Sequence, residues 1–262
     1  MNRIQTIIDK EWAEVFKNRA VLLTVVLLPV LFTVLPLVVL NTMRGAGVTG
    51  GSTDMPANFA RICNSSYSAS DCMQVYIINE FLLLFMLMPL AIPIAISAYS
   101  IVGEKTTHSL EPLLATPIST VELLTGKAIA AAAPAILATW ACFAIFALAT
   151  PLVGASAAIQ AYILSPIWLI AIIVLGPLMT VAAVIFSIMV SSRVADPRVA
   201  EQVSMVLIVP LLGLLFAQIG GLVVINVEFM LISVVVLALI DVGLMYLGAS
   251  FFQRENILTK WK

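Results

Sequence analysis

The sequence is poor in charged residues. Lys, Arg, Asp and Glu make up 10% of its 262 residues, whereas soluble domains have about 25%. Hydrophobic residues make up 62%, and the mean hydropathy is +1.12. A soluble surface cannot be covered with so few charges, so the composition predicts an integral membrane protein that uses the lipid bilayer as its solvent. The net charge of −1 gives no basis for a nucleic-acid partner.

Motifs for nucleotide hydrolysis and nucleophilic catalysis are also missing. No G-x-x-x-x-G-K-[ST] stretch occurs, because Gly126-Lys127 is followed by Ala128 and lacks the upstream glycine. His108 is the single histidine, and we expect it to be a solvated loop residue. The three cysteines show no metal-ligand spacing. We therefore expect no catalytic, cofactor-binding or metal-binding residues in this chain.

Six apolar runs are present, each long enough to cross a hydrocarbon core of about 30 Å, which takes about 20 helical residues. Because a backbone in lipid must satisfy its own hydrogen bonds, these runs should be helices. We therefore predict an all-α fold with a single transmembrane domain over residues 1–262. Between the last two spans, a simple turn and a re-entrant hairpin at 219–229 both remain open. The expected spans lie near residues 20–40, 76–101, 127–150, 166–190, 204–224 and 229–250.

Lys and Arg indicate the orientation. If both ends lie on one side, that side receives 11 of the 13 basic residues, and the other side receives Arg44 and Arg61. Basic loops stay in the cytoplasm, so both termini should be cytoplasmic in a multi-pass protein of the plasma (inner) membrane. The eleven residues are Arg3, Lys10, Lys17, Arg19, Lys105, Lys127, Arg193, Arg198, Arg254, Lys260 and Lys262.

Residues 1–19 show the pattern of an amphipathic helix. Apolar residues recur at helical spacing on one face, and charged residues occupy the rest. We expect a helix lying in the cytoplasmic interface, with Trp12 at the level of the lipid headgroups. A soluble amphipathic helix is the alternative. The apolar set is Ile4, Ile7, Ile8, Trp12, Val15 and Phe16.

Residues 41–75 form the one long exterior loop, which contains Cys63 and Cys72. Oxidation is allowed on that side of the membrane, so one interpretation is a disulfide between them, and the other is two free thiols. Asp241 lies midway along the sixth predicted span, where it either lines a pathway or holds helices together. Glu80 and Glu228 lie nearer the exterior boundary and are not expected to form a site.

A polar segment at 103–119 separates the second and third spans. Ser109 can cap a short helix with Glu111 and Pro112 in its first turn. Ser119 and Glu122 form a second capping pattern. Leu110, Leu113 and Leu114 share one face of a helix too short to be stable alone. The pattern predicts an elbow that rests either on lipid headgroups or on another protein.

The elbow resembles the signature of ABC-2 type exporter permeases, G-E-K-E-x-G-T-L-E-x-L-L-x-T-P-x-S-x-x-E-x-x-x-G-K. Thr106, Thr107 and His108 depart from it. The six spans and the segment "SSRVADPRVAEQVS" at 191–204 are also similar, so the resemblance covers nearly the whole chain. The matching residues are Gly103, Glu104, Lys105, Leu110, Glu111, Leu113, Leu114, Thr116, Pro117, Ser119, Glu122, Gly126 and Lys127.

This resemblance implies a permease subunit of an ATP-driven exporter, which forms half of the translocation pathway. The partners would be a pair of ATPase subunits, which hold ATP and Mg²⁺, and a second permease, identical or homologous. The substrate would be a drug, a lipid or another small or hydrophobic molecule or ion. A secondary transporter or channel and a membrane scaffold are the alternatives. Carried over from the family, the ATPase contacts are Glu104, Lys105, Glu111, Leu113, Leu114, Thr116 and Pro117.

Overall fold

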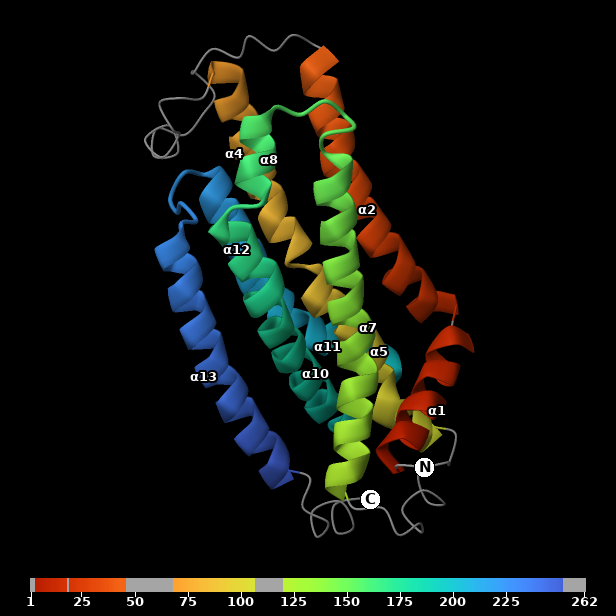
Figure 1. Cartoon of the computed structure of the whole chain (residues 1–262). Helices are drawn as coiled ribbons and strands as arrows, with labels where there is room; N and C mark the ends of the chain where they lie inside the picture. Colours follow the sequence, from red (N-terminus) through yellow and green to blue (C-terminus); the bar gives the residue numbers. More distant parts are fainter. Residues whose placement is uncertain (1–2, 18, 46–67, 107–119, 252–262) are drawn as a thin grey trace.

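The computed structural model describes residues 3–17, 19–45, 68–106 and 120–251 (Figure 1). Throughout these ranges the chain is helical, with turns between the helices and no strand. The elements are α1 (Arg3–Lys17), α2 (Arg19–Gly45), α4 (Ala69–Phe85), α5 (Met88–Thr106), α7 (Thr120–Ala149), α8 (Ala157–Ile163), α9 (Pro166–Leu169), a π-helix η1 (Ile170–Leu175), α10 (Gly176–Arg193), α11 (Pro197–Ser204), a 3₁₀ turn η2 (Met205–Leu207), α12 (Ile208–Ile219) and α13 (Val227–Phe251).

Six helical segments are long and apolar enough to cross a membrane, which confirms the predicted all-α membrane fold. The second and fourth segments are each built from more than one helix. Neither the interfacial position of the N-terminal helix nor the predicted elbow helix is established by this finding. The segments are Val21–Met43, Ser70–Glu104, Val121–Ala149, Ala157–Arg193, Pro197–Ile219 and Val227–Gly248.

Prolines account for the irregular points in these two spans. The second span breaks after Phe85, four residues before Pro89, which cannot donate to the Phe85 carbonyl and whose ring crowds it. The fourth span passes through the π-helix η1 just before Pro177, which likewise leaves the Ile173 carbonyl without its usual donor. In these two spans the sequence is continuously apolar, but the regular α-helical hydrogen bonding is interrupted at the prolines.

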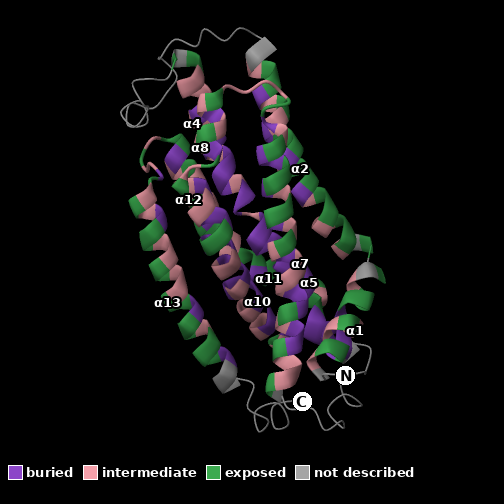
Figure 2. Cartoon of the chain, in the orientation of Figure 1, coloured by how far each residue is buried: buried purple, intermediate pink, exposed green. Residues whose placement is uncertain are grey.

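The core is centred on α5, which packs against α10 and α7 and is coloured almost throughout as buried in Figure 2. Of the six segments, the second is the most buried within the molecule, and the sixth is the least buried. Side chains on the outer faces of α2 and α13 are exposed and apolar, as expected of helices that face lipid. The second and fourth spans therefore form the interior, and α2 and α13 flank it.

The last two spans are joined by a short connection at the end of the bundle away from α1 (Figure 1). Gly221 has φ +69, a left-handed conformation that glycine adopts without strain. Asn226 then caps α13, because its Oδ1 accepts the backbone N–H of Phe229 at 2.8 Å. Residues 220–226 thus form a turn and an irregular stretch between α12 and α13, and the choice between a simple turn and a re-entrant hairpin at 219–229 stays a prediction.

Candidate functional site

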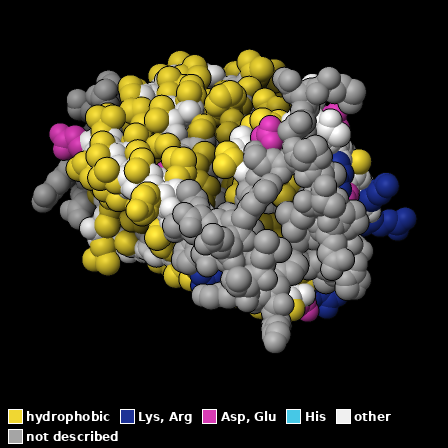
Figure 3. Space-filling view, turned by 90° about the horizontal axis from the view of Figure 1, so that it is seen from below, with side chains coloured by type: hydrophobic (Ala, Val, Ile, Leu, Met, Phe, Trp, Pro, Cys, Tyr) yellow, Lys and Arg dark blue, Asp and Glu magenta, His cyan; other side chains and the backbone are white. Residues whose placement is uncertain are grey.

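The amphipathic helix α1 lies across the ends of α5 and α7, at the end of the bundle where α13 also finishes (Figure 1). Ile7 and Glu11, one helical turn apart on α1, are both buried against the bundle. The opposite face of α1 carries exposed residues, including Lys17. In the view onto this end, Lys and Arg side chains lie at the edge of the described surface (Figure 3). A charged residue of α1 thus points into the protein rather than toward water.

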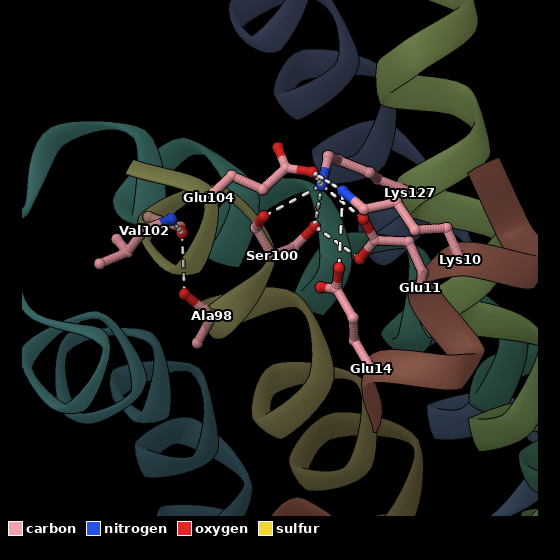
Figure 4. Close-up of polar contacts among 9 residues, drawn as sticks. Lys10, Glu11, Glu14, Ala98, Ser100, Val102, Glu104 and Lys127 are labelled. Atoms are coloured by element: carbon pink, nitrogen blue, oxygen red, sulfur yellow. Dashed lines mark hydrogen bonds and ion pairs between the residues drawn. The ribbon is translucent and has the colours of Figure 1, made fainter. Parts of the chain in front are cut away.

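Lys127 of α7 is the centre of a buried charge cluster (Figure 4). Its ammonium lies 2.6 Å from Glu11 Oε1 and 3.0 Å from Glu104 Oε1 of α5. It also donates to the carbonyl and the hydroxyl of Ser100, each at 3.0 Å. The Ser100 hydroxyl in turn donates to Glu11 Oε2 at 3.1 Å. These contacts join three helices that are far apart in sequence.

Lys10 extends the cluster toward the surface. Its Nζ donates to Glu104 Oε1 at 2.5 Å and lies 3.6 Å from Glu14. Partial burial acts to lower the pKa of Lys10, but the hydrogen bond to Glu104 and the charges of Glu104, Glu14 and Glu11 outweigh it and raise the pKa above its ordinary value. The stabilisation that Lys10 gains from these contacts is fully present below the ordinary pKa of lysine. It is lost only as the pH rises through the raised pKa of Lys10. Lys10 therefore stays charged at physiological pH.

A serine of α10 ties the same part of α5 to the fourth span. Ser191 Oγ donates to the Ala98 carbonyl at 2.7 Å and accepts the Val102 N–H at 3.1 Å. In a regular helix those two backbone groups would pair with each other. Ala200 of α11 packs with Ala98 and Val102. The last turns of α5 are thus held by α1, α7, α10 and α11 together.

Trp12 connects α1 to the third span by a hydrogen bond to a backbone carbonyl of α7 that has no donor within its own helix. Pro134 has no N–H, so the Ala130 carbonyl four residues earlier in α7 lacks its helical donor. The Trp12 indole N–H donates to this carbonyl at 3.0 Å. Trp12, which we predicted to anchor α1 among lipid headgroups, is therefore hydrogen-bonded to α7.

A glycine allows the close approach of α1 and α7. A Cβ placed on Gly126 would lie 2.9 Å from Cγ2 of the buried Ile7, closer than carbon atoms can pack. Gly126 is one residue before Lys127, so the steric contact and the ion pair occur on the same turn of α7. Any larger residue at 126 would push α1 away from the cluster.

The cluster is suited to holding helices together. Lys127 directs its three donors at four acceptors on Glu11, Glu104 and Ser100. Within the described residues there is also no group of three or more His, Cys, Asp or Glu side chains that could hold a metal. What the cluster can do is transmit displacement between helices.

Most residues predicted to contact an ATPase lie outside the described residues. Those are Glu111, Leu113, Leu114, Thr116 and Pro117, as well as the side chain of Lys105, and for them the contact stays a prediction. Glu104 is 3% exposed and bound to Lys10 and Lys127, so its carboxylate is directed into the protein.

Two other predicted groups stand as follows. Asp241 is buried in α13, and neither of its carboxylate oxygens has a hydrogen-bond partner among the described residues. The choice between a pathway role and a packing role therefore stays open.

Cys72 lies in the first turn of α4, whereas Cys63 lies outside the described residues, so their pairing stays a prediction.

The sequence analysis missed the roles of Glu11 and Lys127. Lys127 was counted among the basic residues expected on the cytoplasmic side and as the last residue of the motif, without a partner, and Glu11 was assigned to no face of the N-terminal helix. A signal was present, because Glu11 follows Ile7 by four residues and so shares its face. The partner helix could not be found in this way, because periodicity shows which face is buried but not what covers it.

A comparison with known protein families tests whether the chain belongs to the family that its sequence resembles. Residues 5–233 match the family described as ABC-2 family transporter protein. This range begins in α1 and ends in α13, so it includes all members of the charge cluster. The comparison with curated proteins gives no match. Because the family match covers far more than half of the chain and agrees with its six membrane-spanning helices, the protein belongs to the ABC-2 transporter family as a membrane-embedded permease.

Proposed function

We propose that this chain is the permease subunit of an ATP-driven exporter in the plasma (inner) membrane, with both termini in the cytoplasm. It would form half of the translocation pathway with a second permease, identical or homologous. A pair of separate ATPase subunits would hold ATP and Mg²⁺ and supply the energy. The substrate would be a drug, a lipid or another small or hydrophobic molecule or ion.

One observation carries the coupling part of this proposal. Glu104 lies at the start of the predicted elbow and Lys127 lies beyond its end, and their side chains meet at 3.0 Å. The segment between them is therefore pinned at its base, where α5 and α7 come together. Both residues also contact α1, through Lys10 and Glu11.

This geometry limits how the protein can respond to a force on the elbow. Burial makes separation of the charges costly, because a buried ion left alone loses far more than an exposed one. A push on residues 103–119 would therefore move α1, α5 and α7 as a unit. The Ser191 hydrogen bonds would carry that movement to α10. ATP-driven closure of the ATPases would act on the spans in this way.

Copurification with the ATPase tests the proposal. Changing both Leu113→Asp and Leu114→Asp places two charges on the face expected to enter the ATPase groove. Loss of two apolar anchors at an interface should weaken the complex by at least about tenfold. The measurement is the amount of ATPase retained by tagged permease after washing, together with ATP-dependent transport in vesicles.

A matched control uses the same double change at the opposite end. Leu152 and Leu222 are exposed leucines on the exterior turns, so Leu152→Asp with Leu222→Asp should leave the bound ATPase unchanged. If the 113/114 variant keeps its full complement of ATPase, the coupling assignment is wrong. Transport that continues without any ATPase would instead identify a secondary transporter or channel, and absence of transport in the intact complex would favour a scaffold.

A further inference from the structure

Asp241 is a buried carboxyl group inside the sixth span, which is the least buried of the six. Its side chain is 2% exposed, and neither carboxyl oxygen has a hydrogen-bond partner among the described residues. It lies 14 residues after Val227, where the span begins, and seven before Gly248, where it ends. An ionisable side chain at such a depth is costly and is kept in membrane helices mainly for a function.

Asp241 belongs to the face of α13 that packs against α10, and the two helices lie side by side (Figure 1). Leu237, one turn earlier on this face, packs against the core. Gly248, two turns later, comes so close to α10 that a Cβ placed on it would lie 3.5 Å from Cγ2 of Ile185. The adjacent Ile240 is instead exposed. The span thus turns this acid toward the protein and its apolar side chains toward lipid.

Among the described residues, no basic side chain faces Asp241. Helix α13 packs chiefly against α10, η1 and α9, and neither η1 nor α9 contains a titratable residue. Arg193, the one titratable residue of α10, lies eight residues beyond Ile185. Because Asp241 lies seven residues before Gly248, which contacts Ile185, Arg193 is roughly 20 Å from it along the helix axes. The other titratable residues of α13 are both exposed, namely Glu228 and Tyr246.

These surroundings favour the neutral, protonated form of the Asp241 side chain. A carboxylate buried without a cation or a hydrogen-bond donor loses its hydration and gains nothing in return, so such a group takes up a proton instead. The other buried acids differ, because Glu11 and Glu104 each contact the ammonium of Lys127. An asparagine would have the same size and no charge to suppress. What the acid adds is the ability to release its proton when water reaches it.

We propose that Asp241 is a proton-binding site within the sixth span. The carboxyl group holds its proton while α13 packs against α10, and it exchanges that proton with water when the contact between the two helices opens. A proton needs no cavity, so the close packing of this interface is compatible with the site. The proposal goes beyond the exporter function and does not depend on the contact with an ATPase.

Infrared spectroscopy of the purified full chain tests the site, in a detergent without carbonyl groups and at neutral pH. A protonated carboxyl group has a C=O stretching band that a carboxylate lacks. The native chain should show this band, and Asp241→Asn should lose the part of it that corresponds to one carboxyl group per chain. Transfer to D₂O should shift the same band to lower frequency, because the proton of an exchangeable site is replaced by a deuteron.

The matched control is Glu228→Gln, which removes an exposed acid from the first turn of the same helix and should leave the band unchanged. Loss of a carboxylate band in Asp241→Asn, with the carboxyl band intact, would show that Asp241 is ionised and overturns the site. A carboxyl band that never shifts in D₂O would identify a sealed structural acid and also overturns it.

A second measurement applies if Asp241→Asn does not fold. Carbon-13 labelling of aspartate in the native chain should shift the carboxyl band, because Asp241 is the described aspartate that is buried without a partner. Asp9 and Asp196 are exposed, and Asp71 accepts a hydrogen bond from Ser156 at 2.8 Å, so these three should contribute carboxylate bands. A carboxyl band that the label does not shift excludes Asp241 as its source and overturns the site.

The proton site and the coupling proposal fail separately. The carboxyl band is measured on the permease alone, whereas coupling is measured as retained ATPase. If the band depends on Asp241 but the Leu113/Leu114 variant keeps its ATPase, the coupling proposal fails and the proton site stands. If the ATPase is lost as expected but Asp241 contributes no exchangeable carboxyl band, the coupling proposal stands and the proton site fails.

Discussion

At the scale of single residues, Lys127 shows how a motif position acquires a structural meaning. It closes the sequence signature that begins at Gly103, and the sequence analysis places it at the start of the third predicted span. In the structure it is 2% exposed and contacts Glu11, Glu104 and Ser100. The signature therefore specifies internal contacts of the permease as well as the elbow surface.

Replacing Lys127 tests the cluster. Lys127→Met keeps the volume but leaves Glu11 and Glu104 buried without their central cation, so we expect a loss of about 3–5 kcal/mol in the free energy of unfolding. Thermal unfolding in detergent measures it. The control is Lys17→Met on the exposed face of α1, for which the expected change is within about 0.5 kcal/mol. Equal effects of the two substitutions would show that the cluster contributes no stability.

At the scale of elements, prolines release carbonyls that other helices then use. Pro134 releases the Ala130 carbonyl, which accepts the Trp12 indole N–H. Pro93 releases the Pro89 carbonyl, which accepts the Thr180 hydroxyl of α10 at 3.0 Å. In both cases the lost helical bond becomes a contact between helices. Prolines in these spans therefore specify packing partners in addition to bending the helix.

A double-mutant cycle tests this relation. Trp12→Phe removes the indole donor and should destabilise the fold by about 1 kcal/mol beyond the change in packing. In a Pro134→Ala background, residue 134 again supplies an N–H to the Ala130 carbonyl, so the same substitution should cost less. The expected coupling is about 0.5–1.5 kcal/mol from unfolding measurements on the four proteins. Additive effects would mean that Pro134 has no part in the Trp12 contact.

The elements also show what the sequence could predict. Long apolar runs predict membrane spans because lipid forces helices, and this holds for all six segments. The helical spacing of Ile4, Ile7 and Ile8 predicts an amphipathic α1. The partner of its buried face follows from tertiary packing, which brings residues 11, 104 and 127 together.

At the scale of the whole molecule, charge and fold agree on a two-sided arrangement. Helix α1 and the last turn of α13 lie at the same end of the bundle (Figure 1). Among the described basic residues, Lys10, Lys17 and Arg193 belong to elements that reach this end, and the turns at 150–156 and 220–226 contain none. Under the positive-inside rule we expect this end to face the cytoplasm, which would place the charge cluster on the side where ATP is found.

Cysteine labelling in intact cells tests the orientation. Lys17→Cys and Leu152→Cys are made separately in a chain whose three native cysteines are changed to alanine, because both positions are exposed and lie at opposite ends. A maleimide that cannot cross membranes should label Leu152→Cys in intact cells, since that turn faces outward. It should label Lys17→Cys only after the membrane is opened. The cysteine-free chain gives the background. The reverse pattern would place the charge cluster outside, where it could not receive force from an ATP-driven partner.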